Sequence, residues 1–235
     1  MFMNKRSAAS LFLSLVLLVA VGAVGVTVGR HWGNAAPVST TTTTTTTTVA
    51  ATEQPATAIW PFASSATSFG DPLLAAQTFA IDYLGFTRPL IGAFQPGDNR
   101  SGEVQVRPSS LSIPTTILVR QLTSSNTWWV LGASSPHLQV TSPTALRMIS
   151  SPVMLTGRST AFEAVVNVEV RQDGSLNALV RSTVMGGSMG VMGPYARRIT
   201  FPKPSARGGA IVYRTLSAKD GSVVDATALR ISFAP

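Results

Sequence analysis

The chain has 235 residues, 45% of them hydrophobic, and a formal net charge of +8 at pH 7. This length accommodates one large domain or two small ones, and the apolar fraction is sufficient for a packed core. Because the sequence contains no cysteine, disulfides, iron–sulfur clusters, thiolate zinc sites and a lipid-modified cysteine anchor are excluded.

An uncharged, largely apolar run at residues 8–29 predicts a single transmembrane helix. A helix of about 20 residues crosses the roughly 30 Å of hydrocarbon in a bilayer. Lys5 and Arg6 precede the run, so the positive-inside rule places residues 1–7 in the cytoplasm and the bulk of the chain outside the cell membrane. A cleaved signal peptide is the alternative, with the Asn-Ala-Ala at residues 34–36 as a poor cleavage site.

Residues 30–70 contain nine consecutive threonines, from Thr40 to Thr48. This segment lacks an apolar pattern that would offset the entropy of ordering, so we predict a disordered, Thr-rich stalk. Its apolar interruption at residues 59–62 is short. Threonine hydroxyls in a secreted segment offer acceptors for O-linked sugars.

Residues 71–136 predict a small α+β module. Asp71 is a good N-cap, Pro72 suits the first helical position, and Gly85 is placed to end the helix. Three strand-like runs follow, at residues 102–107, 115–122 and 127–133. A helix laid over a small antiparallel sheet accommodates these elements.

Short strand-like runs punctuated by Gly and Pro fill residues 137–235. The runs are residues 137–141, 153–156, 163–171, 176–183, 195–201, 210–217 and 223–233. About seven strands at such spacing predict an all-β immunoglobulin-like sandwich. Residues 166–171 and the final run alternate apolar with polar residues, which predicts one buried and one solvent-facing side and makes Glu169 a surface charge. Asp173-Gly174 predicts a two-residue hairpin turn.

Four short motifs in this region resemble a known family. They are Ser151-Pro152-Val153 with Gly157, Ala161-Phe162-Glu163, Met189-Gly190 with Gly193-Pro194-Tyr195, and Ser217-Ala218-Lys219-Asp220-Gly221. Together they resemble the immunoglobulin-like domain of bacterial spore germination proteins, the Gmad family, over residues 141–233. The resemblance implies a non-catalytic module on an envelope-associated bacterial protein. Tyr195 stands where phenylalanine is expected, and the germination-protein-M-type domain that usually accompanies the family is not recognisable in residues 71–133.

Few residues indicate catalysis. The two histidines, His31 and His137, have no recognisable nucleophile motif beside them, and no His cluster supports a transition metal. Residues 98–103 predict a turn stabilised by Asp and Asn side chains rather than a calcium loop. Asp98 and Glu163 are carboxylates that a wall-modifying hydrolase with a site between the two external modules would use, and this is the alternative function. We expect no catalytic, cofactor or metal site.

Basic residues concentrate in the predicted sandwich. Residues 141–235 contain eleven Lys and Arg against five Asp and Glu, whereas residues 71–140 contain four of each kind. The candidate partner-binding residues are Arg197, Arg198, Lys203, Arg207 and Arg214, together with the adjacent Trp128 and Trp129. Outside a membrane such a surface suits an anionic cell-wall polymer, anionic lipid headgroups or an envelope protein, and not nucleic acid. The alternative is a solvated basic face that binds no partner. We therefore expect a non-catalytic, membrane-anchored envelope protein that binds or positions such a partner.

Met185, Met189 and Met192 lie in one glycine-rich stretch. Flexible thioethers suit an adaptable contact surface, and the alternative is a loop that only caps one end of the sandwich. In the membrane segment, Gly25 and Gly29 are spaced for close helix approach, which would suit a structural subunit of a larger membrane complex.

Overall fold

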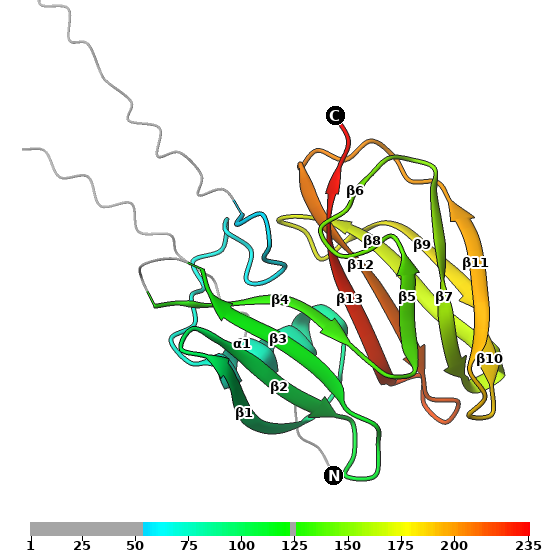
Figure 1. Cartoon of the computed structure of the whole chain (residues 1–235), viewed down its shortest axis with the longest axis horizontal. Helices are drawn as coiled ribbons and strands as arrows, with labels where there is room; N and C mark the ends of the chain where they lie inside the picture. The colour runs from blue at the N-terminus through cyan, green and yellow to red at the C-terminus, as the bar shows by residue number, and fades with distance from the viewer. Residues whose placement is uncertain (1–53, 123–125) are drawn as a thin grey trace, which may run out of the picture. The chain divides into compact units, whose positions relative to one another are not determined.

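The computed structural model describes residues 54–122 and 126–235 (Figure 1). The predicted cytoplasmic tail, the predicted transmembrane helix and the stalk up to residue 53 lie outside the described residues. Within the part that is described, no helix is long and apolar enough to span a membrane.

A short helix opens residues 71–136, the region that we predicted to be an α+β module and refer to by that name. Its α-helix, α1, spans Pro72–Thr78 and continues as a π-helix, η1, over Phe79–Leu84. The Asp71 side chain caps the start by accepting a 2.8 Å hydrogen bond from the Leu73 N–H. Gly85 follows the last turn in the left-handed conformation, with φ of 87°. The helix therefore begins and ends where the capping residues predicted.

Strands make up most of the remaining described chain. In the α+β module they are β1 (Leu90–Asp98), β2 (Ser101–Arg107), β3 (Thr115–Gln121) and β4 (Trp128–Ser134). In the sandwich they are β5 (Leu138–Ser142), β6 (Met148–Ile149), β7 (Val153–Ala161), β8 (Val165–Gln172), β9 (Ala178–Met185), β10 (Gly187–Ser188), β11 (Gly193–Ile199), β12 (Gly208–Leu216) and β13 (Val223–Phe233). A 3₁₀ turn, η2 (Phe162–Ala164), separates β7 from β8. Every run predicted as a strand overlaps one, whereas β1 and the two-residue strands β6 and β10 were not indicated by the sequence.

Two sheets form from these strands. The larger has the order β1-β2-β3-β4-β13-β12-β8-β9 with β6 beside β13, and the smaller has the order β10-β7-β11 with β5 beside β7. Neighbouring strands are antiparallel except for the short pairs β10–β7 and β6–β13. In the sandwich, β5, β7 and β11 form one layer and β13, β12, β8 and β9 the other (Figure 1). This arrangement is the predicted immunoglobulin-like β-sandwich.

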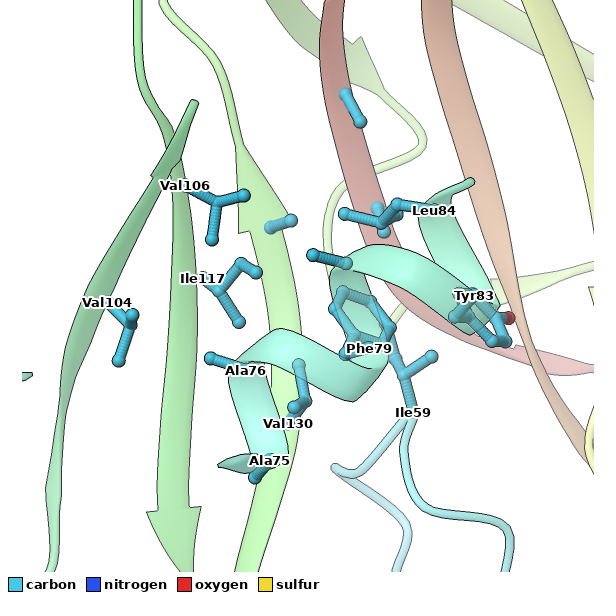
Figure 2. Close-up of a cluster of buried hydrophobic side chains, with 14 of the residues drawn as sticks. Ile59, Ala75, Ala76, Phe79, Tyr83, Leu84, Val104, Val106, Ile117 and Val130 are labelled. Carbon is cyan, nitrogen blue, oxygen red and sulfur yellow. The ribbon is translucent and has the colours of Figure 1, made fainter. Parts of the chain in front are cut away.

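The larger sheet continues from the α+β module into the sandwich, because Ala133 of β4 pairs with Ala228 of β13. Its central strands have a hydrophobic core on each face. Val212 of β12 joins the core beneath the helix, whereas the next residue, Tyr213, joins the core of the sandwich. Figure 2 shows the helix-side core, with Phe79 of η1 at its centre.

The one-sided burial predicted for residues 166–171 and 223–233 is wrong. Glu169, Arg171 and Arg230 alternate with apolar residues, yet each is only 4–5% exposed. Other segments of the chain cover them: Arg171 donates to a carbonyl oxygen of the helix, and Arg230 donates to one in the segment before the helix. Alternation reports which side chains are polar, whereas exposure depends on what packs over that face.

The last part of the predicted stalk, residues 54–70, packs along β4. The Ile59 N–H donates a 2.8 Å hydrogen bond to the Val130 oxygen, and the Trp128 N–H donates a 2.8 Å bond to the Phe69 oxygen. Ile59 and Phe69 are 1% and 3% exposed. Residues 54–70 are therefore ordered and not part of a disordered stalk, because their apolar side chains find hydrogen bonds and a hydrophobic surface on a distant strand.

The connection between β8 and β9 is also longer than the predicted two-residue turn, and comprises residues 173–177. Gly174 has the positive φ that the turn requires, 76°. The Asp173 carboxylate accepts hydrogen bonds from both terminal nitrogens of Arg230 in β13, and the Nη2–Oδ2 distance is 2.8 Å. The turn residue is thus used as an ion-pair partner for a buried guanidinium.

Candidate functional site

A cavity of about 360 Å³ opens at the end of the sandwich where β7 and β12 end and β13 begins. We call it the end cavity. Its wall includes His137, Thr160, Phe162, Met189, Leu216 and Asp225. These residues come from distant parts of the chain, so the fold rather than a local motif assembles the cavity.

The polar part of the end cavity is a histidine paired with a buried carboxylate. The Nδ1 atom of His137 lies 3.0 Å from Oδ2 of Asp225, and the Ser135 hydroxyl donates a 3.0 Å hydrogen bond to Oδ1. The Asp225 side chain is 5% exposed, whereas that of His137 is 36% exposed. The carboxylate therefore fixes the orientation of an imidazole that solvent and ligands can reach.

This pairing differs from a nucleophilic triad. In a Ser-His-Asp triad the imidazole lies between the hydroxyl and the carboxylate. Here Asp225 lies between Ser135 and His137, and the His137 backbone N–H also donates to the Ser135 hydroxyl oxygen at 3.2 Å. The geometry suits a fixed polar contact for a ligand, because Asp225 occupies only one of the two ring nitrogens.

The apolar part of the end cavity is exposed. Phe162 in η2 is 57% exposed, Met189 in the loop before β11 is 89% exposed, and Leu216 at the end of β12 is 38% exposed. Two further apolar side chains lie near Met189 in the chain but outside the cavity wall: Met185 at the end of β9 is 64% exposed, and Val191 in the same loop is 69% exposed. Exposed large apolar side chains that gather in one place mark interaction surfaces more often than single ones do.

A second polar cluster centres on Glu169, whose side chain is 7% exposed. Its Oε2 atom accepts hydrogen bonds from Nε of Arg171, at 2.7 Å, and from Nη2 of the same residue. Its Oε1 atom accepts from Nε of Arg181, at 3.2 Å, and from Nη2 of Arg214. Three guanidinium groups therefore share one carboxylate, on the face of the sheet that meets the helix.

The electrostatics of this cluster follow from burial and from the excess of positive charge. Burial by itself would raise the pKa of Glu169, but the charge and hydrogen bonds of Arg171, with those of Arg214 and Arg181, outweigh burial and hold the pKa below its usual value. Burial lowers the pKa of Arg214, Glu169 opposes that change, and the charges of Arg171 and Arg181 add to it. The cluster therefore favours the charged form of Glu169 and disfavours the charged form of Arg214.

The structure separates the predicted partner-binding residues into three environments. Arg197, Arg198, Lys203 and Arg207 are exposed on β11 and the following loop. Arg214 is not on that surface, because it belongs to the Glu169 cluster. Trp128 is buried against Phe94, with ring centroids 5.3 Å apart, and Trp129 is half-buried. The seven residues therefore do not form one surface.

The sandwich with its end cavity is similar to a known protein family. Residues 137–222 match Gmad2, the immunoglobulin-like domain of bacterial spore germination. The match confirms the resemblance that the four motifs predicted, and it begins at the histidine of the end cavity. No curated protein and no solved structure was found to match the chain.

One glycine of the Gmad2 motifs has a clear structural reason. A Cβ atom on Gly157 in β7 would collide with the carbonyl oxygen of Gln139 in β5 and with the hydroxyl of Tyr195 in β11. Tyr195, which replaces the expected phenylalanine, donates a 3.3 Å hydrogen bond to that same Gln139 oxygen. The missing side chain at position 157 thus lets a tyrosine cross the sheet and bond to the far strand.

The other residues considered from sequence lie outside the end cavity. Glu163 is exposed as the middle residue of η2, with a φ of 51°. Asp98 accepts a 2.7 Å hydrogen bond from the Arg100 N–H, as the predicted turn requires, and this bond is the main cause of its lowered pKa. In residues 54–122 and 126–235, no group of three or more His, Asp or Glu is placed to hold a metal ion.

Sequence reasoning missed the two polar groups that the fold assembles. His137 and Asp225 are 88 positions apart, and no spacing rule connects them. The sequence did contain a signal for the Glu169 cluster. Glu169 and Arg171 are two residues apart and so share one face of their strand, and Arg181 lies in the next predicted strand. That pattern also occurs on solvated strands, so only the covering helix reveals its burial.

Proposed function

We propose that this chain is a non-catalytic, membrane-anchored envelope protein whose immunoglobulin-like domain binds a protein partner at the end cavity. The observation that carries the proposal is the group of exposed apolar side chains around a cavity with an oriented imidazole. The Gmad2 match supports a binding role, because immunoglobulin-like sandwiches present their loops at their two ends.

The chemistry of the end cavity favours a protein segment as ligand. Burying Phe162 and Met189 against a partner removes apolar surface from water, which favours association by about 25 cal/mol per Å². Methionine adapts its shape to the surface that it meets. His137 adds one polar contact that fixes the orientation of the bound segment.

Photo-crosslinking in intact cells tests this proposal. A photoreactive amino acid replaces Met189, which is 89% exposed, and in the control it replaces Leu111 of the α+β module, which is 96% exposed. We expect a discrete adduct from position 189 that position 111 does not give. Adding Phe162→Asp should remove the adduct, because a charge in the apolar wall opposes binding. Equal adducts from both positions, or none from position 189, would contradict the proposal.

The chemistry of the adduct separates the two kinds of partner. An adduct that a protease shortens contains a protein, whereas one that a wall-degrading enzyme shortens contains a wall polymer. The second result would replace the protein partner by an anionic wall polymer.

A specific observation favours that polymer as the second candidate. Arg197, Arg198, Lys203 and Arg207 are exposed close together in the chain, on β11 and the loop after it. Binding of the full-length protein to isolated wall material should then fall as salt rises, since screening acts within about 10 Å at 0.1 M salt. The double variant Arg197→Gln, Arg198→Gln should weaken that binding. Salt-independent binding, or no binding at low salt, counts against the polymer.

Membrane anchoring is part of the proposal and is supported by the apolar run at residues 8–29 and the basic residues before it. The absence of cysteine allows a direct test. A membrane-impermeant maleimide should label Lys203→Cys in intact cells. It should label Asn4→Cys only after the cells are lysed. Labelling of both in intact cells, or of neither, would contradict the proposed topology.

The alternative of a different class is a wall-modifying hydrolase. Glycoside hydrolysis uses two carboxyl groups that flank the bond to be cleaved. The buried carboxylate near the helix, Glu169, is shared by three arginines, which supports a packing role. We expect that the full-length protein releases no fragments from isolated wall material. Release that Glu163→Gln, Asp98→Asn or His137→Ala abolishes would establish the hydrolase instead.

A further inference from the structure

The Glu169 cluster carries more positive charge than its carboxylate balances. Arg171, Arg181 and Arg214 all donate to Glu169. The nearby carboxylate Asp173 is engaged by Arg230. Glu169 therefore balances only one of the three positive charges of these arginines. One or two further negative charges would neutralise the rest.

A cavity of about 330 Å³ borders this cluster, and we call it the arginine cavity. Its wall includes Asn167, Glu169, Arg181, Ser182, Arg214 and Gly221. Glu169 is the one carboxylate in that wall. The polar groups come from neighbouring strands: Arg214 of β12 pairs with Asn167 of β8, and Glu169 of β8 pairs with Arg181 of β9.

Donors remain for a ligand in the arginine cavity. The Nε atom of Arg214 is buried and, among the described residues, has no hydrogen-bond partner. Arg181 uses Nε for Glu169, and its side chain is 69% exposed, so its terminal nitrogens face solvent. A buried donor without a partner is costly, so an acceptor that reached Nε of Arg214 would be favoured. The Arg214 side chain as a whole is 18% exposed.

Guanidinium groups in this arrangement select oxyanions. The planar fork of arginine matches the two oxygens of a carboxylate or a phosphate, and a partly buried pair is stronger than an exposed one. The amide of Asn167, which pairs with Arg214 and lies on the same face of the sheet, adds a neutral hydrogen-bonding group to the same wall. We propose that the arginine cavity binds one oxyanion group, a phosphate or a carboxylate, through Arg181 and Arg214.

This inference does not rest on the end cavity or on its partner. The two cavities share Leu216 but use different polar groups, a histidine–aspartate pair in one and arginines in the other. Loss of the Met189 adduct would leave the oxyanion site intact, and loss of oxyanion binding would leave the adduct intact.

Anion titration of the full-length protein, kept in a neutral detergent at constant ionic strength, tests the inference. Inorganic phosphate and acetate are the two probes, followed by calorimetry or by the amide spectra of β8, β9 and β12. We expect saturable binding of one probe with a Kd tighter than about 10 mM. Stronger binding of phosphate indicates a phosphate-bearing ligand, and stronger binding of acetate indicates a carboxylate-bearing one.

Matched variants locate the binding. Arg181→Gln, at a mostly exposed side chain, should weaken binding at least about tenfold, which is 1.4 kcal/mol. Arg214→Lys should also weaken it, because lysine keeps the charge and loses the fork. Arg198→Gln changes the net charge equally on the other sheet and should leave the Kd within about twofold. The inference is overturned if binding of neither probe saturates, or if Arg198→Gln weakens binding as much as Arg181→Gln does. If Arg214→Lys fails to fold, the result for Arg181→Gln decides the test.

Discussion

The guanidinium of Arg171 lies 4.7 Å from the centre of the Tyr83 ring and donates a 2.8 Å hydrogen bond to the Tyr83 carbonyl oxygen. These residues are 88 positions apart, one on β8 of the sandwich and the other in the last turn of the helix. The same guanidinium bonds to Glu169. One side chain thereby satisfies a helix carbonyl, covers an aromatic ring and neutralises a buried acid.

Replacing Glu169 should destabilise the protein strongly. In Glu169→Gln the three arginines lose their shared negative charge while they stay close together, and breaking a buried pair costs about 3–5 kcal/mol. The measurement is the free energy of unfolding of the described modules in urea. Glu163→Gln is the control, because Glu163 is exposed and its change should stay within about 0.5 kcal/mol. A loss below about 1 kcal/mol at position 169 would contradict the role of the cluster.

The pKa of Glu169 predicts how stability depends on pH. Its pKa in the folded protein is lowered, chiefly because Arg171 outweighs the effect of burial. The unfolded state therefore takes up the proton first as the pH falls, and the contribution of Glu169 to stability is present above the unfolded pKa, about 4.3. That contribution should decline below this pH and be lost as the pH passes through the folded pKa. In Glu169→Gln, unfolding curves should show a weaker decline over the same range, and an unchanged decline would refute the assignment.

Ile59 tests whether the segment before the helix is part of the fold. Its side chain is 1% exposed in the core of the α+β module (Figure 2). Ile59→Ala should lower the free energy of unfolding by about 2–5 kcal/mol, since it leaves a cavity. Leu111→Ala removes the same number of carbons from a side chain that is 96% exposed, and it should change little. If both variants behave alike, residues 54–70 belong to the stalk after all.

Gly157→Ala should destabilise the smaller sheet. The new methyl group would press on the Gln139 carbonyl oxygen and the Tyr195 hydroxyl, and overpacking of this kind costs about 1–3 kcal/mol. Gly70→Ala is the control, because a Cβ atom there has no neighbour within 4 Å. Thermal unfolding of the two variants compares the costs. A neutral Gly157→Ala would mean that β5 and β11 can separate freely around β7.

Sequence patterns predicted most of the strands but missed β1 and the two-residue strands β6 and β10. The failure at β1 has a physical reason. The runs that became β2, β3 and β4 carry β-branched or aromatic residues with turn residues between them. In β1, Gly92, Pro96 and Gly97 interrupt the pattern, and all of its residues are exposed or only partly buried. Pairing with β2, and not local preference, holds this edge strand in place.

The candidate sites were less predictable than the strands. Phe162 and Met189 were noted from sequence as motif residues, but nothing local placed them around one cavity. Glu169 was expected in solvent and proved to be the centre of a buried cluster. Which residues surround a side chain depends on the pairing of distant strands, and a single sequence does not contain that pairing in readable form.

The sequence by itself determined where the helix begins and ends and where most of the strands lie, and it identified the immunoglobulin-like domain. Caps, turns and alternation act through bonds and side chains a few residues apart, so they can be read locally. Only the tertiary structure decided that the two modules share a sheet, that both faces of β8, β12 and β13 are covered, and that His137 meets Asp225. Those outcomes depend on burying apolar surface between segments that are far apart in the chain, because hydrophobic burial is not directional and specifies no partner in advance.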